Sequence, residues 1–112
     1  MPMHVVRATS LDVPHEPLPA EQIREGTPTT GTVAVPAVAG LDVGVWEHSP
    51  GVSTDVEADE VFVVLSGRAS VAVEGGPVLE LAPGDLCVLE AGARTTWTVH
   101  ETLRKVYVTP AG

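Results

Sequence analysis

The sequence predicts an all-β fold, an antiparallel barrel or jelly roll of seven or eight short strands. First, 20 of the 112 residues are valine, and β-branched side chains favour strands because a helix restricts their χ1 angle. Second, 11 glycines and 10 prolines are spread along the chain and mark turns at intervals of roughly 8 to 12 residues, as in sandwiches and barrels. Third, several segments alternate apolar and polar residues, the pattern of a half-buried strand.

The N-terminal third predicts an extended arm and an edge strand. A chain of 112 residues and 11.6 kDa suits one domain with one core. We therefore expect residues 1–38, the arm with an edge strand near 31–38, to belong to the same domain as a barrel over residues 39–112. The edge position follows from the prolines, which cannot donate to a central ladder. Pro19 and Gly26 predict a helix of one or two turns over residues 19–25. His4 and His15 lie in the arm and are expected on the surface.

The strand pattern becomes regular from residue 41 onward. Apolar residues at alternate positions predict a half-buried strand there, which ends at the turn residues 49–51. Glycine, proline and a bend near Glu101 separate the segments that follow. The further strands predicted by these boundaries cover residues 60–66, 69–73, 78–81, 85–89, 95–100 and 103–109.

Composition excludes several classes of function. With 15 acidic and 6 basic residues the formal charge is −9, which repels nucleic acid and anionic membrane surfaces. No window approaches the roughly 18 to 20 apolar residues of a membrane helix, and the first ten residues lack the apolar stretch of a signal peptide. We therefore expect a cytoplasmic protein. A single cysteine, Cys87, excludes an internal disulfide and a multi-thiolate zinc site, and its apolar neighbours predict a small buried hydrophobe.

Residues 44–107 resemble the cupin superfamily, whose fold is a double-stranded β-helix, or jelly-roll barrel, described by two motifs. Glu60 and Gly67 keep the glutamate-x6-glycine spacing of the first motif, and Gly84-Asp85 with Gly92 stand in register with the second. The Trp-Glu element at 46–47 and the Arg-Lys-x-Tyr element at 104–107 are similar to small cupins related to ureidoglycine aminohydrolase. The resemblance implies a cupin barrel with a pocket inside it.

The family's metal ligands are missing from the matching positions. Counting back from Glu60, the two histidines of the first motif fall on Ser53 and Asp55, or on residues 54 and 56, depending on spacing. The histidine of the second motif falls on Thr95. A site of three histidines and one carboxylate cannot be assembled there, so no cofactor is expected. A divalent metal remains conceivable only if His48, Asp55, Glu60 and a water form a rebuilt set.

Glu60 is the candidate catalytic residue. If its side chain points into the barrel, as the resemblance implies, burial would raise its pKa and equip it for proton transfer. The alternative is a solvated carboxylate, or one paired with Arg94 or Lys105. Asp55 would face Glu60 across the barrel mouth, but the acidic segment 49–59 favours a solvent-facing loop for it.

Other polar and aromatic residues are candidate ligand contacts. Glu47 and His48 are neighbours on a strand, so only one of them can enter the barrel. If Trp97 faces inward, His100 faces outward by the same alternation. The basic pair 104–105 would either steer an anionic ligand or form salt bridges. The predicted ligand-binding set is Trp46, Glu47, Asp55, Phe62, Thr95, Trp97 and Tyr107.

Two classes of function agree with these features. The first is a small-molecule enzyme, an isomerase, lyase, cyclase or hydrolase of a polar metabolite, with Glu60 as general acid–base. The second is a metal-free binding or sensing protein that holds a small molecule without turnover, suggested by the missing histidines. For either function we expect a homodimer formed through strand or arm packing.

Overall fold

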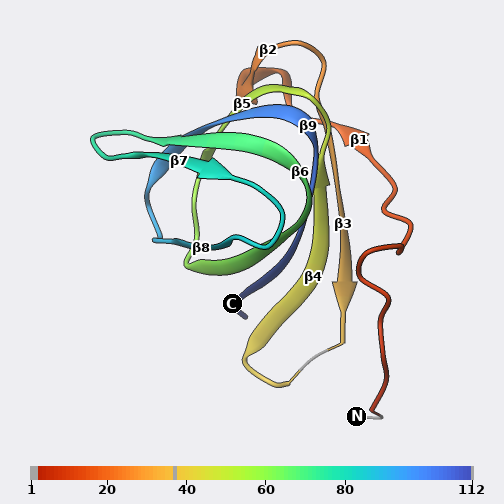
Figure 1. The fold of residues 1–112 in the computed structure, drawn as a ribbon. Helices are drawn as coiled ribbons and strands as arrows, with labels where there is room; N and C mark the ends of the chain where they lie inside the picture. Colours follow the sequence, from red (N-terminus) through yellow and green to blue (C-terminus); the bar gives the residue numbers. More distant parts are fainter. Residues whose placement is uncertain (1–2, 37, 112) are drawn as a thin grey trace.

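The computed structural model describes residues 3–36 and 38–111 and confirms the all-β prediction (Figure 1). One curled antiparallel sheet has the strand order β1-β3-β4-β9-β5-β2, and β6 joins it through β9 and carries β7 and β8. No helix in the described part of the chain is long and apolar enough to cross a membrane. The strands are β1 (Glu16–Pro17), β2 (Ile23–Glu25), β3 (Thr29–Val35), β4 (Leu41–His48), β5 (Gly51–Val56), β6 (Glu60–Val73), β7 (Val78–Leu81), β8 (Leu86–Leu89) and β9 (Arg94–Pro110).

Two long strands replace four predicted short ones. Residues 60–66 and 69–73 join into β6, and residues 95–100 and 103–109 join into β9. Gly67 was expected to end a strand, but it lies at an irregularity where the β6–β9 register shifts. Its φ of +91°, and a backbone so close that a side chain would collide with the carbonyl oxygen of Thr102, require glycine. Glycine therefore bends the strand there without ending it.

The prediction for residues 49–59 was wrong. Residues 51–56 form β5, which pairs with the first half of β9 over six residues and with β2 on its other side. The predicted helix at 19–25 is also wrong in extent, since a 3-10 turn covers only Ala20–Gln22 and β2 follows at once. β3 has the edge position predicted for it over residues 31–35, because the two-residue β1 pairs only with Thr29 and Thr30 at its start.

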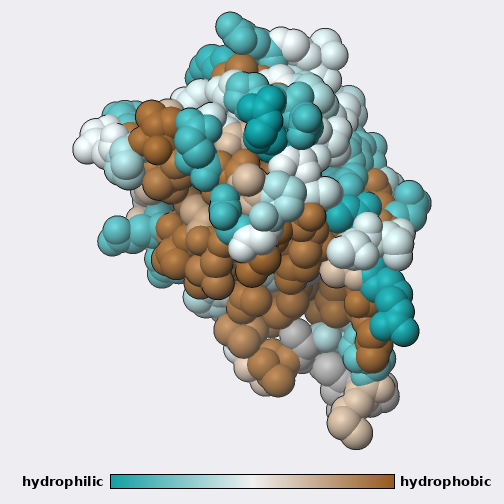
Figure 2. Space-filling model, viewed as in Figure 1, coloured by the Kyte–Doolittle hydropathy of each residue, from teal (hydrophilic) through white to brown (hydrophobic). Residues whose placement is uncertain are grey.

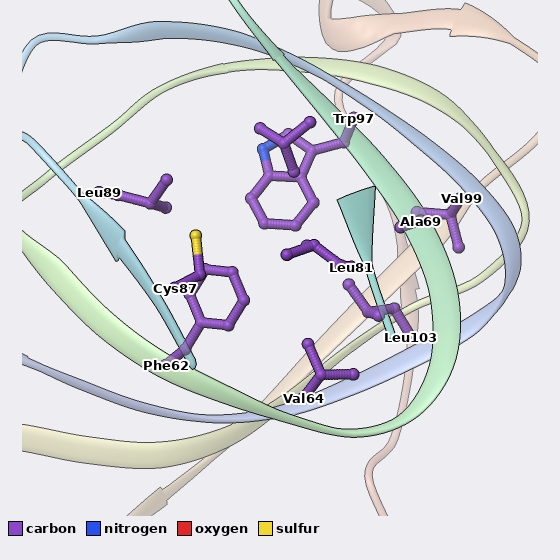
Figure 3. Close-up of a cluster of buried hydrophobic side chains, with 10 residues drawn as sticks. Phe62, Val64, Ala69, Leu81, Cys87, Leu89, Trp97, Val99 and Leu103 are labelled. Carbon is purple, nitrogen blue, oxygen red and sulfur yellow. The ribbon is translucent and has the colours of Figure 1, made fainter. Parts of the chain in front are cut away.

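The hydrophobic core fills the interior of the curled sheet (Figure 3). Alternation directs Phe62 and Val64 of β6, and Trp97 and Val99 of β9, to the inside. Cys87 is 7% exposed in this core, as predicted for a small hydrophobe, and burial raises the pKa of its thiol. The core members that these strands share with β7 and β8 are Phe62, Val64, Ala69, Val71, Leu81, Cys87, Leu89, Trp97, Val99 and Leu103.

The outer face of the same sheet is also apolar. The registers of β8, β6, β9, β4 and β3 place side chains in two rows across five strands. Figure 2 shows apolar residues gathered over β8, the start of β6 and the lower part of β4. The first row is Val88, Val61, Val108, Val43 and Val35; the second is Leu86, Val63, Val106, Val45 and Val33.

The N-terminal arm lies against the outer face at the neighbouring row of Gly31, Glu47 and Arg104. Val13 is buried, and a side chain at Gly31 of β3 would meet Val13 and Pro14. The Arg104 guanidinium donates to the carbonyl oxygen of Ala8 at 2.8 Å. The arm therefore lies against β3, β4 and β9 of its own sheet, beside β3 in Figure 1.

Candidate functional site

A cavity of about 270 Å³ opens at one end of the barrel, between the inner faces of β3, β4, β5, β6 and β9. This volume suits a small metabolite. Its wall combines aromatic rings with acidic, basic and hydroxyl groups. The chemically distinctive side chains that line it are Trp46, His48, Ser53, Asp55, Glu57, Glu60, Trp97, Lys105 and Tyr107.

Lys105 forms the centre of this cavity wall. Its Nζ donates to Glu60 Oε2 at 2.6 Å, and the two side chains are 6% and 17% exposed. The same Nζ lies 4.4, 4.3 and 5.0 Å from the ring centroids of Trp46, Phe62 and Trp97. A buried ammonium requires such compensation, because desolvation otherwise disfavours its charge. Of the sequence alternatives for Glu60, the structure shows pairing with Lys105.

The pairing of β4 with β9 decides between Glu47 and His48. Trp46 lies opposite Lys105 and faces inward, as does His48, whereas Glu47 lies opposite Arg104 on the outer face. Glu47 was a predicted ligand contact, but the alternation of the strand turns it away from the cavity. Its carboxylate instead accepts from Arg104 Nε at 2.8 Å and lies 2.7 Å from His15 Nε2.

Both residues of the basic pair are therefore engaged in salt bridges, as the second sequence alternative stated. Arg104 faces outward and Lys105 faces inward. His15 is half-buried beside Glu47 and Thr29, so the expectation of a simple surface histidine was wrong. His100 is exposed, opposite in direction to the buried Trp97, as the alternation predicted.

His48 and Ser53 form a buried polar pair on the wall. His48 Nδ1 lies 2.6 Å from the carbonyl oxygen of Ser49, and Nε2 lies 2.8 Å from Ser53 Oγ. Because a carbonyl only accepts, Nδ1 carries the proton, and Nε2 accepts from the Ser53 hydroxyl. Burial lowers the pKa of His48. The imidazole is therefore held neutral in one tautomer.

Glu57 is a cavity residue that sequence reasoning missed. Its Oε2 accepts from Thr95 Oγ1 at 2.6 Å and from Trp97 Nε1 at 3.0 Å. Thr95, a predicted ligand contact, thus lies beside the cavity and holds Glu57 in place. The signal was the Asp-x-Glu alternation at residues 55 and 57, which a strand would direct to one side.

Asp55 borders the cavity from β5, so the loop that was favoured for it is wrong, but its side chain is solvent-exposed as that interpretation expected. Burial, with the nearby charge of Glu57, raises the pKa of Asp55. Trp46, Trp97 and Tyr107 of the predicted set also line the cavity. Phe62 lies instead in the core, 1% exposed, with its ring against the Lys105 ammonium.

Comparison with known proteins identifies the family. Residues 39–107 match the model of the EutQ-like cupin domain. The chain belongs to the EutQ-like cupin family. Among curated proteins, no significant sequence match to this cupin is found.

Solved structures share the fold of this cupin. The EutQ protein of Clostridium difficile is 20% identical with a TM-score of 0.66, covering 74% of this chain and 68% of that one. A protein of unknown function from Pseudomonas syringae is 21% identical with a TM-score of 0.76, covering 89% and 45%. A putative ethanolamine utilization protein from Salmonella typhimurium is 13% identical with a TM-score of 0.62, covering 90% and 97%.

The residues present do not fit the three-histidine metal site of the wider superfamily. By motif spacing the histidine positions carry Ser53 and Asp55, or Thr54 and Val56, together with Thr95. Both nitrogens of His48 are engaged by Ser49 and Ser53, and Glu60 is bound to Lys105. Within residues 3–36 and 38–111, no three His, Cys, Asp or Glu side chains gather closely enough to hold a metal ion. The conceivable set of His48, Asp55 and Glu60 shares the cavity without forming a ligand cluster.

Proposed function

We propose that this cupin is a small-molecule enzyme in which Glu60 and Lys105 transfer protons to and from a polar substrate. The observation that carries the proposal is the 2.6 Å contact of Glu60 Oε2 with Lys105 Nζ on the wall of the cavity, beside three aromatic rings. Ion pairs that are fixed in a concave, partly dry site are a recurrent arrangement for acid–base chemistry.

The two groups suit complementary roles. The Glu60 carboxylate accepts a proton from the substrate, and the Lys105 ammonium stabilises the negative charge that develops and returns a proton at the end of the reaction. Such chemistry covers isomerisation, elimination, cyclisation and hydrolysis. A positioned acid or base contributes typically about 10² to 10⁴ in rate, so the loss of either group has a measurable consequence.

The charge of the cavity supports a neutral or positively charged substrate over an anion. Lys105 is balanced by Glu60, while Glu57 is held by a hydroxyl and an indole N–H with no cation among those partners. Asp55 adds a further carboxyl group at the same wall. A small molecule with amine, amide or ureide groups would meet acceptors there.

Two likenesses guide the choice of compounds to test. The Trp-Glu and Arg-Lys-x-Tyr elements are similar to ureidoglycine aminohydrolases, so ureides and amidic intermediates of nitrogen metabolism belong in the first set. One structural neighbour is described as a putative ethanolamine utilization protein, so small amino alcohols form the second set. The neutral ureides of the first set and the cationic amino alcohols of the second fit the charge of the cavity.

The test is proton nuclear magnetic resonance of compound pools in D₂O with this cupin. The spectra detect consumption of a compound and also exchange of carbon-bound hydrogen for deuterium, so no product needs to be known. We expect turnover or exchange by the unmodified chain, and rates at least about 100-fold lower for Glu60→Gln and Lys105→Met. Glu80→Gln is the matched control, since Glu80 bonds Ser70 on the exposed surface.

The results separate enzyme from binding protein. Turnover that survives both cavity substitutions would remove Glu60 and Lys105 from the chemistry. Compounds that bind in the cavity without consumption or exchange would assign this cupin to binding or sensing. The Glu60–Lys105 pair would then serve the stability of the wall alone.

A further inference from the structure

We propose that Ser53 and His48 form a nucleophile–base pair that hydrolyses small uncharged esters in the cavity. The observation behind the proposal is the 2.8 Å contact between Ser53 Oγ and His48 Nε2 on the cavity wall. Ser53 carries the acyl group, and His48 moves the proton. This is a further activity of the cupin, and it does not rest on proton transfer by Glu60 and Lys105.

The hydrogen bond between the two side chains has the direction that a nucleophile needs. The carbonyl oxygen of Ser49 accepts from His48 Nδ1 at 2.6 Å, so the proton is on Nδ1 and the lone pair is on Nε2. The Ser53 hydroxyl therefore donates to Nε2. A hydroxyl that donates to an imidazole can pass its proton on as its oxygen attacks a carbonyl carbon.

The imidazole is fixed in this orientation by its surroundings. His48 is 1% exposed and Ser53 is 5% exposed. The Trp46 ring packs against the imidazole, with the ring centroids 5.6 Å apart. The carbonyl group of Ser49 holds the required tautomer, and its dipole stabilises the imidazolium that forms during the reaction. Nucleophile, base and orienting group are thus all present.

His48 is in the protonation state that the first step requires. Burial is the main cause that lowers its pKa, and the charge of Lys105 lowers this pKa further. The neutral imidazole can accept the serine proton. The influence of Lys105 on His48 also shows that the ammonium acts at this part of the wall, where it stabilises the negative charge that develops on the carbonyl oxygen of the ester.

The reaction has two halves, with water as the co-reactant. In the first half, Ser53 Oγ forms a bond to the acyl carbon, the serine proton passes to His48 Nε2, and the bond from the acyl carbon to the leaving oxygen breaks. The leaving oxygen takes the proton from Nε2 and departs as an alcohol. In the second half, water attacks the acyl carbon and gives a proton to Nε2, which returns it to Oγ as the carboxylic acid leaves.

The cavity determines the class of ester. Its volume of about 270 Å³ admits a small acyl group together with a small leaving group. Trp46 and Trp97 offer aromatic surface to the apolar parts of the ester. Glu57 contributes a carboxyl group to the same wall, which disfavours an anionic ester. Acetyl esters of small uncharged alcohols and phenols meet these conditions.

Ser70 provides a matched control within the same chain. Its hydroxyl also donates to a base, the Glu80 carboxylate, at 2.9 Å. This contact lies on the exposed surface between β6 and β7, away from the residues that line the cavity. A reagent that reacts with every serine beside a base would modify both sites, whereas the proposal predicts reaction at Ser53.

The first test is labelling of the native chain with diisopropyl fluorophosphate, a small uncharged reagent that phosphorylates activated serines with loss of fluoride. Peptide mass spectrometry locates the adducts. We expect Ser53 to be labelled at least about 100-fold faster than Ser70, since a positioned base contributes about 10² to 10⁴ in rate. His48→Gln should slow the labelling of Ser53 at least about 100-fold and leave that of Ser70 unchanged.

The second test is hydrolysis of p-nitrophenyl acetate, which measures the complete reaction. We expect the unmodified chain and Ser70→Ala to release p-nitrophenolate at the same rate. Ser53→Ala and His48→Gln should release it at least about 100-fold more slowly. Circular dichroism and thermal unfolding establish that each variant keeps its fold, and the labelling of Ser53 in the unmodified chain depends on no variant.

Three outcomes would overturn the proposal. Ser53 could be labelled no faster than Ser70, which would leave it only a structural partner of His48. Labelling of Ser53 could be undiminished in His48→Gln, which would remove His48 as the base. Ester hydrolysis could be absent, or could persist in Ser53→Ala. These results concern a bond to Ser53 and not the compound pools in D₂O, so they are independent of the outcome for Glu60 and Lys105.

Discussion

Separate removal of the two partners of the Glu60–Lys105 pair should destabilise the chain by unequal amounts. Glu60→Gln leaves the Lys105 ammonium, only 6% exposed, without its carboxylate. Lys105→Met leaves the Glu60 carboxylate, which is 17% exposed and borders the cavity, so water can approach it. The methionine side chain also fills the space between the rings, where its sulfur makes favourable aromatic contacts.

The structure sets the size of each effect. Removing one partner of a buried pair costs about 3 to 5 kcal/mol, because the remaining charge is uncompensated. For Glu60→Gln we expect the lower end, about 3 kcal/mol, since three rings within 5.0 Å of Nζ continue to stabilise the ammonium. For Lys105→Met we expect about 1 to 2 kcal/mol, because solvation replaces part of the lost interaction.

Urea unfolding followed by tryptophan fluorescence measures these free energies, and the double variant completes a thermodynamic cycle. We expect a coupling energy of at least about 1 kcal/mol between the two positions, since they are in direct contact. Equal losses for the two single variants, or a coupling below about 0.5 kcal/mol, would refute the reasoning that Lys105 is the more desolvated partner. Glu80→Gln, at an exposed site, should change the free energy of unfolding by no more than about 0.5 kcal/mol.

Three further predictions test other parts of the structure. Burial lowers the pKa of His48 in the folded chain below its ordinary value of 6.5, so unfolding takes up a proton when the pH is below 6.5. The contribution of neutral His48 to the free energy of unfolding is therefore complete above pH 6.5 and declines as the pH falls. His48→Gln should flatten this decline in urea titrations from pH 5 to 8. Gly44→Ala should cost about 1 to 3 kcal/mol, since its Cβ would lie 2.5 Å from Tyr107 Oη; Gly76→Ala, where the nearest contact is 3.3 Å, is the control, and equal thermal shifts would contradict the packing. Cys87, 7% exposed with a raised thiol pKa, should resist aromatic disulfide reagents until urea unfolds the chain, and rapid native labelling would place it elsewhere.

The sequence was sufficient to predict the fold class because the strand preference of valine and the turn preference of glycine and proline act on the local backbone. β4, β7 and β8 lie close to their predicted positions, where turns bound short alternating segments. The prediction divided β6 and β9 because glycine and acidic residues are ordinary turn signals. Whether Gly67 ends a strand or bends it depends on Thr102, which approaches from a distant part of the chain.

The candidate site was predicted only in part for the same reason. Glu60 was identified from motif spacing and Trp97 as an aromatic ligand contact, and both lie at the cavity. The inward direction of His48 and the outward direction of Glu47 follow from the pairing of β4 with β9. This pairing joins residues that lie more than fifty positions apart in the sequence, so local patterns do not reveal it. Lys105 was identified as one half of a basic pair and as one alternative partner of Glu60, but its aromatic surroundings were not predicted, since they come from three strands.

The position of β9 in the chain has a consequence for protein synthesis. This strand of 17 residues pairs with β4, β5 and β6, and it leaves the ribosome after all three of them. Until then β4 has only β3 beside it, and β5 has only β2. Long-range pairing of this kind slows folding and leaves apolar strands exposed in the meantime. The nascent barrel therefore depends on protection from aggregation until residues 94–110 emerge, and the Lys105 site forms in that same closing step.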